Sequence, residues 1–310
     1  MPDFVIRTLS NAGGTAAISD YGAHLLRWAP AGQPDVIWTP STWRFENGRP
    51  LGGGVPICLP WFGPGYAHGR QTAKRSIHGF ARRSWWRLDS DSFAGGQPAG
   101  GQPAGGQSAE GQLAGSCIRY VLEPADAPAG EVPWLDDEPN PRFRAVYDVT
   151  LQARSLTMAL TVANTGEAPL TFEAALHSYL HVGDLDGARL RGLEGSTYLD
   201  ATIAGFPPKT QADEDVTFGD SAVDRVYYSD YPLELHDAVL GRTIRIDKSG
   251  SPQTVVWNPG RTGGEAFANT RPGAGEWRGF VAVEAALCRD KAITLAPGVS
   301  HTLAQTLTVV

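Results

Sequence analysis

The sequence predicts an all-β protein, and three observations lead to this prediction. Long segments alternate apolar and polar residues with a period of two, which is typical of strands with one buried face. These segments end in clusters of Gly, Pro, Asn or Asp, which favour turns. More than fifteen such candidate strands follow one another at short spacing, and helical signals are weak throughout. Together they predict one large antiparallel β-sandwich, with residues 1–310 forming a single domain.

The composition excludes several classes of function. The chain has 310 residues, of which 42% are hydrophobic and 19% charged, and it carries a net charge of −7. This acidic balance argues against nucleic acid or an anionic membrane as partner. There is no apolar run long enough to span a bilayer and no signal-peptide pattern at the N-terminus. Three scattered cysteines without ligand spacing indicate reduced thiols, so we expect a cytoplasmic protein. We also expect it to be a monomer.

The first third of the chain combines early strands with an irregular segment. Thr15–Pro30 and Asp35–Thr39 have strand patterns. Gly52–Gly65 is too rich in Gly and Pro to be regular, and we expect a loop that brings its backbone and the aromatic residues Trp61 and Phe62 into close contact with another group. The alternative is that these aromatic residues form an apolar plug at the mouth of the sandwich.

A basic cluster follows this loop. Its members are Arg70, Lys74, Arg75, Arg82 and Arg83, five basic residues within 14 positions of an acidic chain. Such a cluster is often only a solvated face. It would equally suit an anionic substrate, because a phosphate group carries about −1.5 to −2 charges and strong acceptor oxygens.

Ala94–Gly115 is a low-complexity segment that repeats every five residues. It offers almost no apolar side chain for a solenoid to stack, so we interpret it as a flexible surface loop within one domain. The strand patterns on either side, Trp85–Asp89 and Cys117–Glu123, should pair as a long hairpin. We expect that deletion of Gly95–Gly111 leaves activity unchanged.

The clearest strand signal is Phe143–Asn164, in which two alternating runs are joined by a turn at Gln152–Ser155. The C-terminal half continues in the same style, and its further candidate strands lie in Arg189–Asp200, Val223–Ser229, Arg242–Asp247, Thr254–Trp257, Phe280–Ala286 and His301–Val310.

Phe172–Leu185 contains two histidines in an apolar framework. If this stretch is a strand, His177 points to the opposite side from Leu176, and His181 lies on the same face as His177. The histidines are then either structural hydrogen-bonding groups or members of a site. A zinc pair at this spacing would require a helix, so we expect no metal and no other cofactor.

Glu284 has a similar setting. In a strand, Val281 and Val283 face one way, whereas Ala282 and Glu284 face the other. A glutamate on a sheet face is often only part of a salt bridge. Together with a histidine, however, it would form an acid/base pair.

Six motifs occur in an order that resembles a known family. The chain is similar to the aldose 1-epimerase (galactose mutarotase-like) superfamily, and within it to the D-hexose-6-phosphate mutarotase branch. This resemblance implies a large antiparallel β-supersandwich that acts on a sugar or sugar phosphate. The motifs are GGGVPICLPWFGP (52–64), HGFARRSWW (78–86), ALHSYLHVGD (175–184), VDRVYY (223–228), VVWNP (255–259) and FVAVEAA (280–286).

The resemblance also implies roles for individual residues. His177 would be the catalytic acid and Glu284 the catalytic base of sugar ring opening. His78, Arg82 and Asp224 would bind the substrate. The reaction would interconvert the α and β anomers of an aldohexose, such as glucose 6-phosphate.

The chain departs from the branch pattern at two positions. Gly52 stands where the branch has a substrate-binding arginine, and Ile77 stands where it has a glutamine. Both changes affect binding rather than the acid/base pair. Arg49, Lys74 or Arg75 would be the candidates to replace the lost arginine, and we include Arg75 among the expected substrate-binding residues.

Trp61, Phe62 and Trp257 are expected to stack on the apolar face of a sugar ring. Two rival functions fit the same residues. One is a carbohydrate-binding or sugar-sensing module that does not catalyse. The other is a glycoside hydrolase or lyase, but hydrolysis normally uses two carboxylates, whereas these motifs offer a histidine and one carboxylate.

Overall fold

The computed structural model describes residues 4–42, 44–72, 74, 76–89, 111–113, 117–268 and 275–310. Within these ranges the chain forms 25 strands and a single α-helix, α1 (Gly260–Ala268). The all-β prediction is confirmed. Short 3-10 turns connect some of the strands, at Ala81–Arg83, Pro124–Asp126, Leu185–Gly187, Glu276–Gly279 and Arg289–Lys291.

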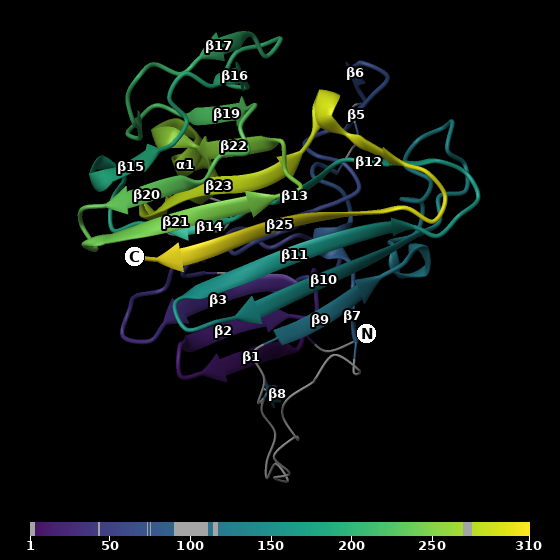
Figure 1. Ribbon diagram of the computed structural model, residues 1–310, viewed down its shortest axis with the longest axis horizontal. Helices are drawn as coiled ribbons and strands as arrows, with labels where there is room; N and C mark the ends of the chain where they lie inside the picture. The colour runs from purple at the N-terminus through teal and green to yellow at the C-terminus, as the bar shows by residue number, and fades with distance from the viewer. Residues whose placement is uncertain are drawn as a thin grey trace.

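The largest sheet has nine strands, and every neighbouring pair is antiparallel. Its central strands lie side by side across the middle of Figure 1. In spatial order the strands are β18 (Val216–Thr217), β15 (Ala188–Arg191), β20 (Leu233–Asp237), β21 (Arg242–Ser249), β25 (Ser300–Val309), β11 (Ser155–Asn164), β10 (Phe143–Leu151), β9 (Cys117–Leu122) and β7 (Arg87–Leu88).

A second sheet of eight strands is also antiparallel and carries most of the site described below. Its order is β17 (Pro208–Thr210), β16 (Thr197–Asp200), β19 (Val223–Tyr227), β22 (Gln253–Asn258), β23 (Phe280–Leu287), β13 (Ala174–Leu176) and β4 (Ile57–Cys58), with β14 (Tyr179–His181) also paired to β23.

The N-terminal segment forms a third sheet, which lies below the other two in Figure 1. Its strands are β3 (His24–Pro30), β2 (Gly14–Ser19), β1 (Ile6–Asn11) and β8 (Gly111–Leu113), and only the β1–β8 pair is parallel. Two short ribbons complete the strands, β5 (Tyr66–Ala67) with β6 (Arg70–Gln71), and β12 (Leu170–Phe172) with β24 (Ile293–Leu295).

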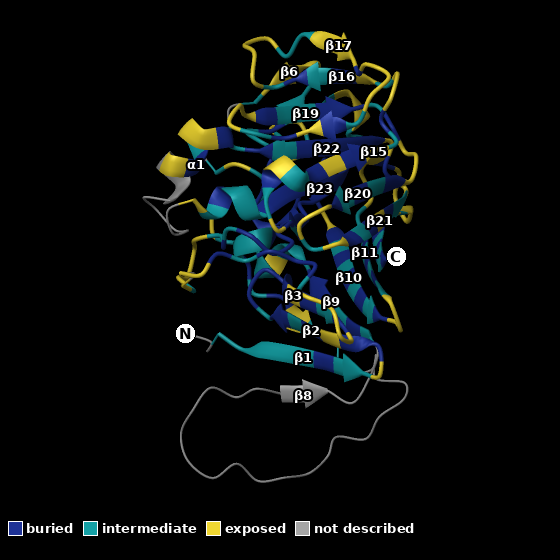
Figure 2. Cartoon of the chain, turned by 90° about the vertical axis from the view of Figure 1, so that its left-hand side faces the viewer, coloured by how far each residue is buried: buried dark blue, intermediate teal, exposed yellow. Residues whose placement is uncertain are grey.

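The two large sheets pack face to face. On β10 and β11 buried residues alternate with half-buried ones, as expected for strands with one face in a core. On β23 all eight residues are buried (Figure 2). Gln305 of β25 links the sheets, because its side chain accepts from Ser178 and donates to the carbonyl of Val283. One face of the eight-stranded sheet thus lies in the core, which leaves the other face available for a site.

Several strand predictions are confirmed, and two in the first forty residues are wrong. The hairpin at Phe143–Asn164 is present, and Arg87 pairs with Val121 across the low-complexity segment. Thr15–Pro30 is two strands rather than one, because the left-handed residues Gly22 (φ 78°) and Ala23 (φ 45°) turn the chain between them. Asp35–Thr39 is not a strand and forms only one bridge, at Ile37.

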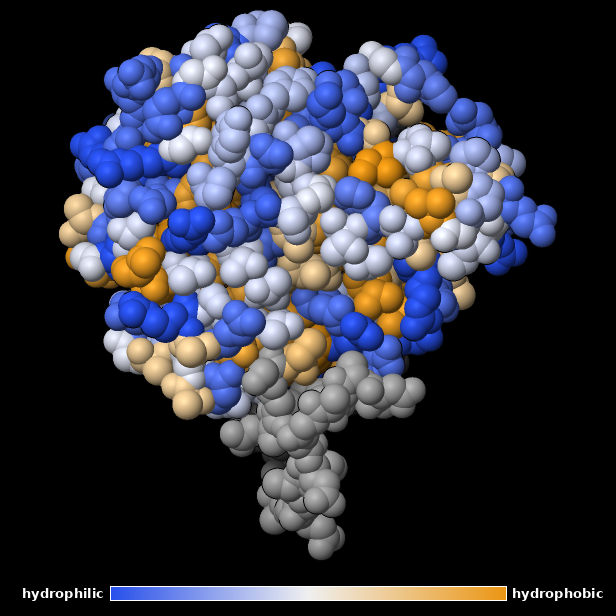
Figure 3. All heavy atoms as spheres, viewed as in Figure 1, coloured by the Kyte–Doolittle hydropathy of each residue, from blue (hydrophilic) through white to orange (hydrophobic). Residues whose placement is uncertain are grey.

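Most of Ala94–Gly115 lies outside the described residues, apart from β8. The single-domain organisation stays a proposal, which is supported by a hydrophobic cluster that draws side chains from the two large sheets and the N-terminal sheet. On the face shown in Figure 3, hydrophobic residues appear in separate spots rather than one patch. None of the helical segments in the described part of the chain has the length and apolar character needed to cross a membrane.

Candidate active site

A cavity of about 600 Å³ opens on the exposed side of the eight-stranded sheet. This volume is typical of sites for small molecules. Segments far apart in the sequence meet in its wall. Six of the seven site residues predicted from the sequence line it, namely His78, Arg82, His177, Asp224, Trp257 and Glu284.

The sheet supplies one wall of the cavity through strand register. Asp224 of β19 lies opposite Trp257 of β22, and Val226 lies opposite Val255, which in turn lies opposite Glu284 of β23. Partners across neighbouring strands point to the same face, and so do residues two apart on one strand. The period-two pattern therefore places the carboxylate of Glu284 on the cavity side, whereas Val281 and Val283 enter the core, as predicted.

His177 lies in a break between two strands. The predicted continuous strand over Phe172–Leu185 is wrong here, because β13 ends at Leu176 and β14 begins at Tyr179. The Ser178 N–H donates to the Leu176 carbonyl, a three-residue turn, and the His177 N–H donates to Pro56. The imidazole then stacks on the ring of Tyr179, with centroids 4.7 Å apart and planes at 9°. The break fixes this imidazole in the cavity wall.

His78 is held in a left-handed conformation (φ 61°), which is uncommon for a residue other than glycine. Its Nδ1 accepts a hydrogen bond from the N–H of Gly63 at 3.2 Å. A neutral imidazole has one acceptor nitrogen, so Nε2 carries the proton. Burial, the charge of Arg82 and the neighbouring His177 hold the pKa of His78 well below its ordinary value. His78 is therefore a neutral hydrogen-bond donor.

His177 and Glu284 form a close pair. His177 Nε2 lies 3.3 Å from Glu284 Oε1, and both side chains are buried. Burial lowers the pKa of the His177 imidazolium to about 3, and burial together with Asp224 raises the pKa of Glu284 well above its ordinary value. Desolvation thus disfavours both charged forms. The pair therefore holds one proton over a wide pH range, on the carboxyl of Glu284 while the imidazole of His177 is neutral.

The comparisons with known proteins agree with this geometry. The family model described as aldose 1-epimerase matches residues 6–95 and 125–308. A Salmonella typhimurium protein provisionally named glucose-6-phosphate 1-epimerase is 31% identical over 249 residues, which cover 79% of this chain and 71% of that protein. A Cenchrus ciliaris protein of the same provisional name is 29% identical over 284 residues, covering 91% of this chain and 78% of that one. The chain belongs to the aldose 1-epimerase family.

Solved structures support the same fold. A Salmonella typhimurium structure provisionally described as a mutarotase aligns with a TM-score of 0.75 at 27% identity, over 97% of this chain and 89% of that one. An Escherichia coli K12 structure provisionally described as an aldose 1-epimerase aligns with a TM-score of 0.71 at 15% identity, over 99% of both chains, and shows the fold alone. The β-supersandwich expectation is confirmed, and the protein is an isomerase of the aldose 1-epimerase type.

Two further charged groups of this epimerase family member lie near His177 and Glu284. Burial and the nearby Asp200 raise the pKa of Asp224 to about 6. The guanidinium of Arg82 donates to the carbonyl of Ile77 at 2.7 Å, and its charge depresses the pKa values of His78 and His177. The epimerase site thus combines a carboxylate that ionises near neutral pH with a fixed cation.

Other sequence-based expectations fall elsewhere in the epimerase. Arg75 lies outside the described residues. His181 does not line the cavity; its Nδ1 contacts the carbonyl of Asp35, because the break at His177 removes the shared face. Phe62 lines the cavity as expected, but Trp61 is buried and donates to the carbonyl of Ser76.

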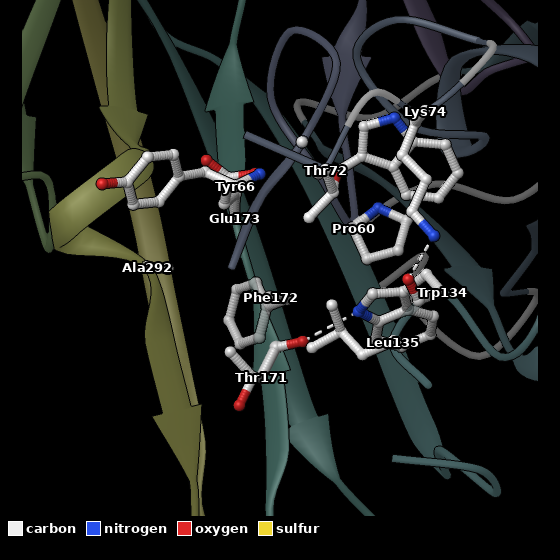
Figure 4. Close-up of a pocket in the computed structure, with 12 residues that line it drawn as sticks. Pro60, Tyr66, Thr72, Lys74, Trp134, Leu135, Thr171, Phe172, Glu173 and Ala292 are labelled. Carbon is white, nitrogen blue, oxygen red and sulfur yellow. Dashed lines mark hydrogen bonds between the residues drawn. The ribbon is translucent and has the colours of Figure 1, made fainter. Parts of the chain in front are cut away.

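The two positions that depart from the branch pattern, Gly52 and Ile77, both line the cavity. Neither of the described candidate replacements for the lost arginine does so. Arg49 pairs with Glu46, and Lys74 donates to the carbonyl of Trp134 beside a smaller pocket (Figure 4).

Several residues that line the cavity of the epimerase were not predicted as site residues. Tyr179 follows His177 by two residues, so the period-two pattern would have placed it on the same face. Phe206 and Arg289 come from a loop and a turn without any strand pattern, and nothing in the sequence singled them out.

Proposed function

We propose that the protein interconverts the α and β anomers of an aldohexose 6-phosphate, such as glucose 6-phosphate, by opening and closing the sugar ring. The observation that carries the proposal is the contact between His177 Nε2 and Glu284 Oε1 in the wall of a sugar-sized cavity. Relatives provisionally named glucose-6-phosphate 1-epimerase support the choice of substrate.

Opening starts once the shared proton has passed from Glu284 Oε1 to His177 Nε2 across their 3.3 Å contact. Glu284 then takes the proton of the C1 hydroxyl while the bond between C1 and the ring oxygen breaks. The ring oxygen receives a proton from His177, which gives an open-chain aldehyde. Rotation about the C1–C2 bond turns the other face of the aldehyde toward the hydroxyl formed from the ring oxygen. Each transfer needs one acid and one base within hydrogen-bond reach.

Ring closure reverses these transfers. The hydroxyl oxygen attacks the aldehyde carbon and returns its proton to His177, while the aldehyde oxygen takes the proton back from Glu284. No proton is gained or lost in a cycle, which fits a pair that holds a single proton. General acid/base action of this kind typically contributes about 10²–10⁴-fold to the rate.

The remaining cavity residues hold the sugar in this scheme. His78 donates through Nε2–H to a sugar hydroxyl, Asp224 accepts from hydroxyls, and Arg82 donates to an oxygen of the substrate. Trp257 and Phe62 offer aromatic faces to the apolar side of the ring. The proposal extends to a cytoplasmic monomer, and all three cysteines, which lie among the described residues, are free thiols.

Two-dimensional exchange NMR tests this function. Interconversion of anomers is measured for glucose 6-phosphate, glucose and galactose side by side, each with and without protein. Acceleration of glucose 6-phosphate exchange above its spontaneous rate, and above that of the free sugars, supports the proposal. Saturable binding without acceleration would instead indicate a carbohydrate-binding module. Acceleration of the free sugars alone would contradict the 6-phosphate assignment.

A further inference from the structure

Arg289 lines the cavity but belongs to none of the recognised motifs. It lies just after β23, the strand that carries Glu284, at the start of the 3-10 turn Arg289–Lys291. Its backbone is left-handed (φ 59°), a conformation that is unfavourable for a residue with a long side chain. Such a conformation persists only where the surrounding structure holds it.

A buried carboxylate holds this conformation. Glu173, which is 2% exposed, accepts the Arg289 N–H through Oε1 at 2.6 Å. Its Oε2 accepts the N–H groups of Phe62 and Tyr66 at 3.1 and 2.9 Å. Figure 4 shows Glu173 next to Tyr66. One carboxylate therefore fixes Arg289 relative to the Phe62–Tyr66 loop, which forms another part of the cavity wall.

The side chain of Arg289 is positioned by two aromatic rings. The guanidinium carbon lies 4.8 Å from the ring centroid of Tyr66 and 4.3 Å from that of Phe206. Contact with aromatic faces leaves the N–H groups at the edge of a guanidinium able to donate in its plane. No carboxylate of the described chain forms an ion pair with this guanidinium. The N–H groups of this guanidinium are therefore not taken up by an ion pair within the described chain.

The two cavity arginines act on different parts of the wall. Arg82 depresses the pKa values of His78 and His177, so its charge acts at the acid/base pair. The charge of Arg289 opposes the rise that burial causes in the pKa of Glu173, and its guanidinium contacts the rings of Tyr66 and Phe206. The cavity thus has a second cationic region, apart from the one at the catalytic pair.

We propose that Arg289 binds the phosphomonoester of the substrate while the anomeric carbon lies at His177 and Glu284. A phosphomonoester carries about −1.5 to −2 charges and three acceptor oxygens, which match the planar fork of a guanidinium. Glu173 is the positioning residue of this subsite. The inference rests on the proposed function, which supplies the sugar phosphate.

The test compares Arg289→Met and Arg289→Lys with the wild type. The ratio of kcat/KM for glucose 6-phosphate to that for glucose should fall about 10- to 100-fold in Arg289→Met, mainly through KM for the phosphate. Arg289→Lys keeps the positive charge but lacks the planar fork of a guanidinium, so the same ratio should fall less in this variant. Arg189→Met is the matched control, because Arg189 is exposed on β15 and its loss changes the net charge equally. An unchanged ratio in Arg289→Met would overturn the proposal.

Calorimetric binding of glucose 6-phosphate separates failure of this proposal from failure of the proposed function. Tighter binding to the wild type than to Arg289→Met, by about 10-fold or more, supports the subsite even if the wild type accelerates no anomer exchange. Equal binding by both proteins overturns the subsite even if the wild type is an active mutarotase. Circular dichroism and the midpoint of thermal unfolding confirm that each variant is folded.

Discussion

His177 Nε2 lies 3.3 Å from Glu284 Oε1, and the other polar atom of each side chain, His177 Nδ1 and Glu284 Oε2, is buried without a hydrogen-bond partner among the described residues. A buried polar group left unpaired is destabilising by about 1–3 kcal/mol. Two such groups in one contact pair are expected at a functional site rather than in a core built only for stability.

The pH dependence of turnover tests the state of this pair. An ordinary imidazole would lose its proton near pH 6.5. Here burial lowers the pKa of His177 to about 3 and raises that of Glu284, so the form with one shared proton persists between these values. We therefore expect kcat to stay level between about pH 5 and 7. A titration of kcat centred near 6.5 would contradict the shared-proton account.

We expect the ionisation of Asp224 to have a separate effect, on substrate binding. Its pKa is raised to about 6, so acidification through pH 6 protonates it and removes an acceptor for sugar hydroxyls. KM should rise as the pH falls below about 6 in the wild type. Asp224→Asn should raise KM by about 10-fold at pH 8 and lose this pH dependence. A KM of Asp224→Asn equal to that of the wild type at both pH values would show that Asp224 does not bind the sugar.

Glu173 predicts how stability varies with pH. Its pKa in the folded protein is raised to about 7, mainly by burial, whereas an unfolded glutamate titrates near 4.3. The folded state therefore binds more protons between these values, and the free energy of unfolding should decrease as the pH rises from about 4.5 to 7. In Glu173→Gln, the free energy of unfolding should fall less over this pH range than in the wild type, by a difference of at most about 3 kcal/mol.

Urea denaturation at pH 5 and pH 8 measures the effect of Glu173. The quantity of interest is the difference between the two pH values, because Glu173→Gln also perturbs the hydrogen bonds to three backbone N–H groups at any pH. Glu167→Gln is the control, since Glu167 is exposed. If Glu173→Gln and the wild type show the same difference, Glu173 does not titrate as described.

We expect a substitution of Gly79, the residue after His78, to lower the stability of the protein. Its φ is +70°, and a Cβ added there would lie 2.0 Å from the carbonyl oxygen of Leu59. Gly79→Ala combines an unfavourable backbone conformation with a clash, and we expect it to reduce the free energy of unfolding by about 2–4 kcal/mol. Gly69→Ala is the matched control, because its φ is +77° but no atom lies within 4 Å of the added Cβ. If urea denaturation shows that both variants lose the same free energy of unfolding, the clash with Leu59 does not contribute.

The strand pattern explains why part of the site was predictable. Alternation over Phe280–Ala286 placed Glu284 opposite to Val281 and Val283, because the side-chain period of a strand is two wherever the strand is regular. The same rule failed for His181, because a three-residue turn at His177 interrupts the strand. A local turn of this kind depends on contacts with Pro56 and Val283, which are distant in the sequence.

Arg289 could not be predicted for a different reason. Its place in the cavity depends on its own left-handed backbone, on the carboxylate of Glu173 between β12 and β13, and on the rings of Tyr66 in β5 and Phe206 in a loop. None of these contacts leaves a periodic signal in the sequence. Glu173 had the same pattern as any sheet glutamate. Its role is evident only because three backbone N–H groups converge on it.

The most direct test of the central claim is two-dimensional exchange NMR of glucose 6-phosphate with the wild type, His177→Asn and Glu284→Gln, with Arg189→Met as the control. We predict that the wild type and Arg189→Met accelerate anomer exchange and that each of the other two variants, folded as judged by thermal unfolding, loses at least about 100-fold of the catalysed rate. A loss of only a few-fold in both folded variants would contradict the assignment of His177 and Glu284 as the acid/base pair.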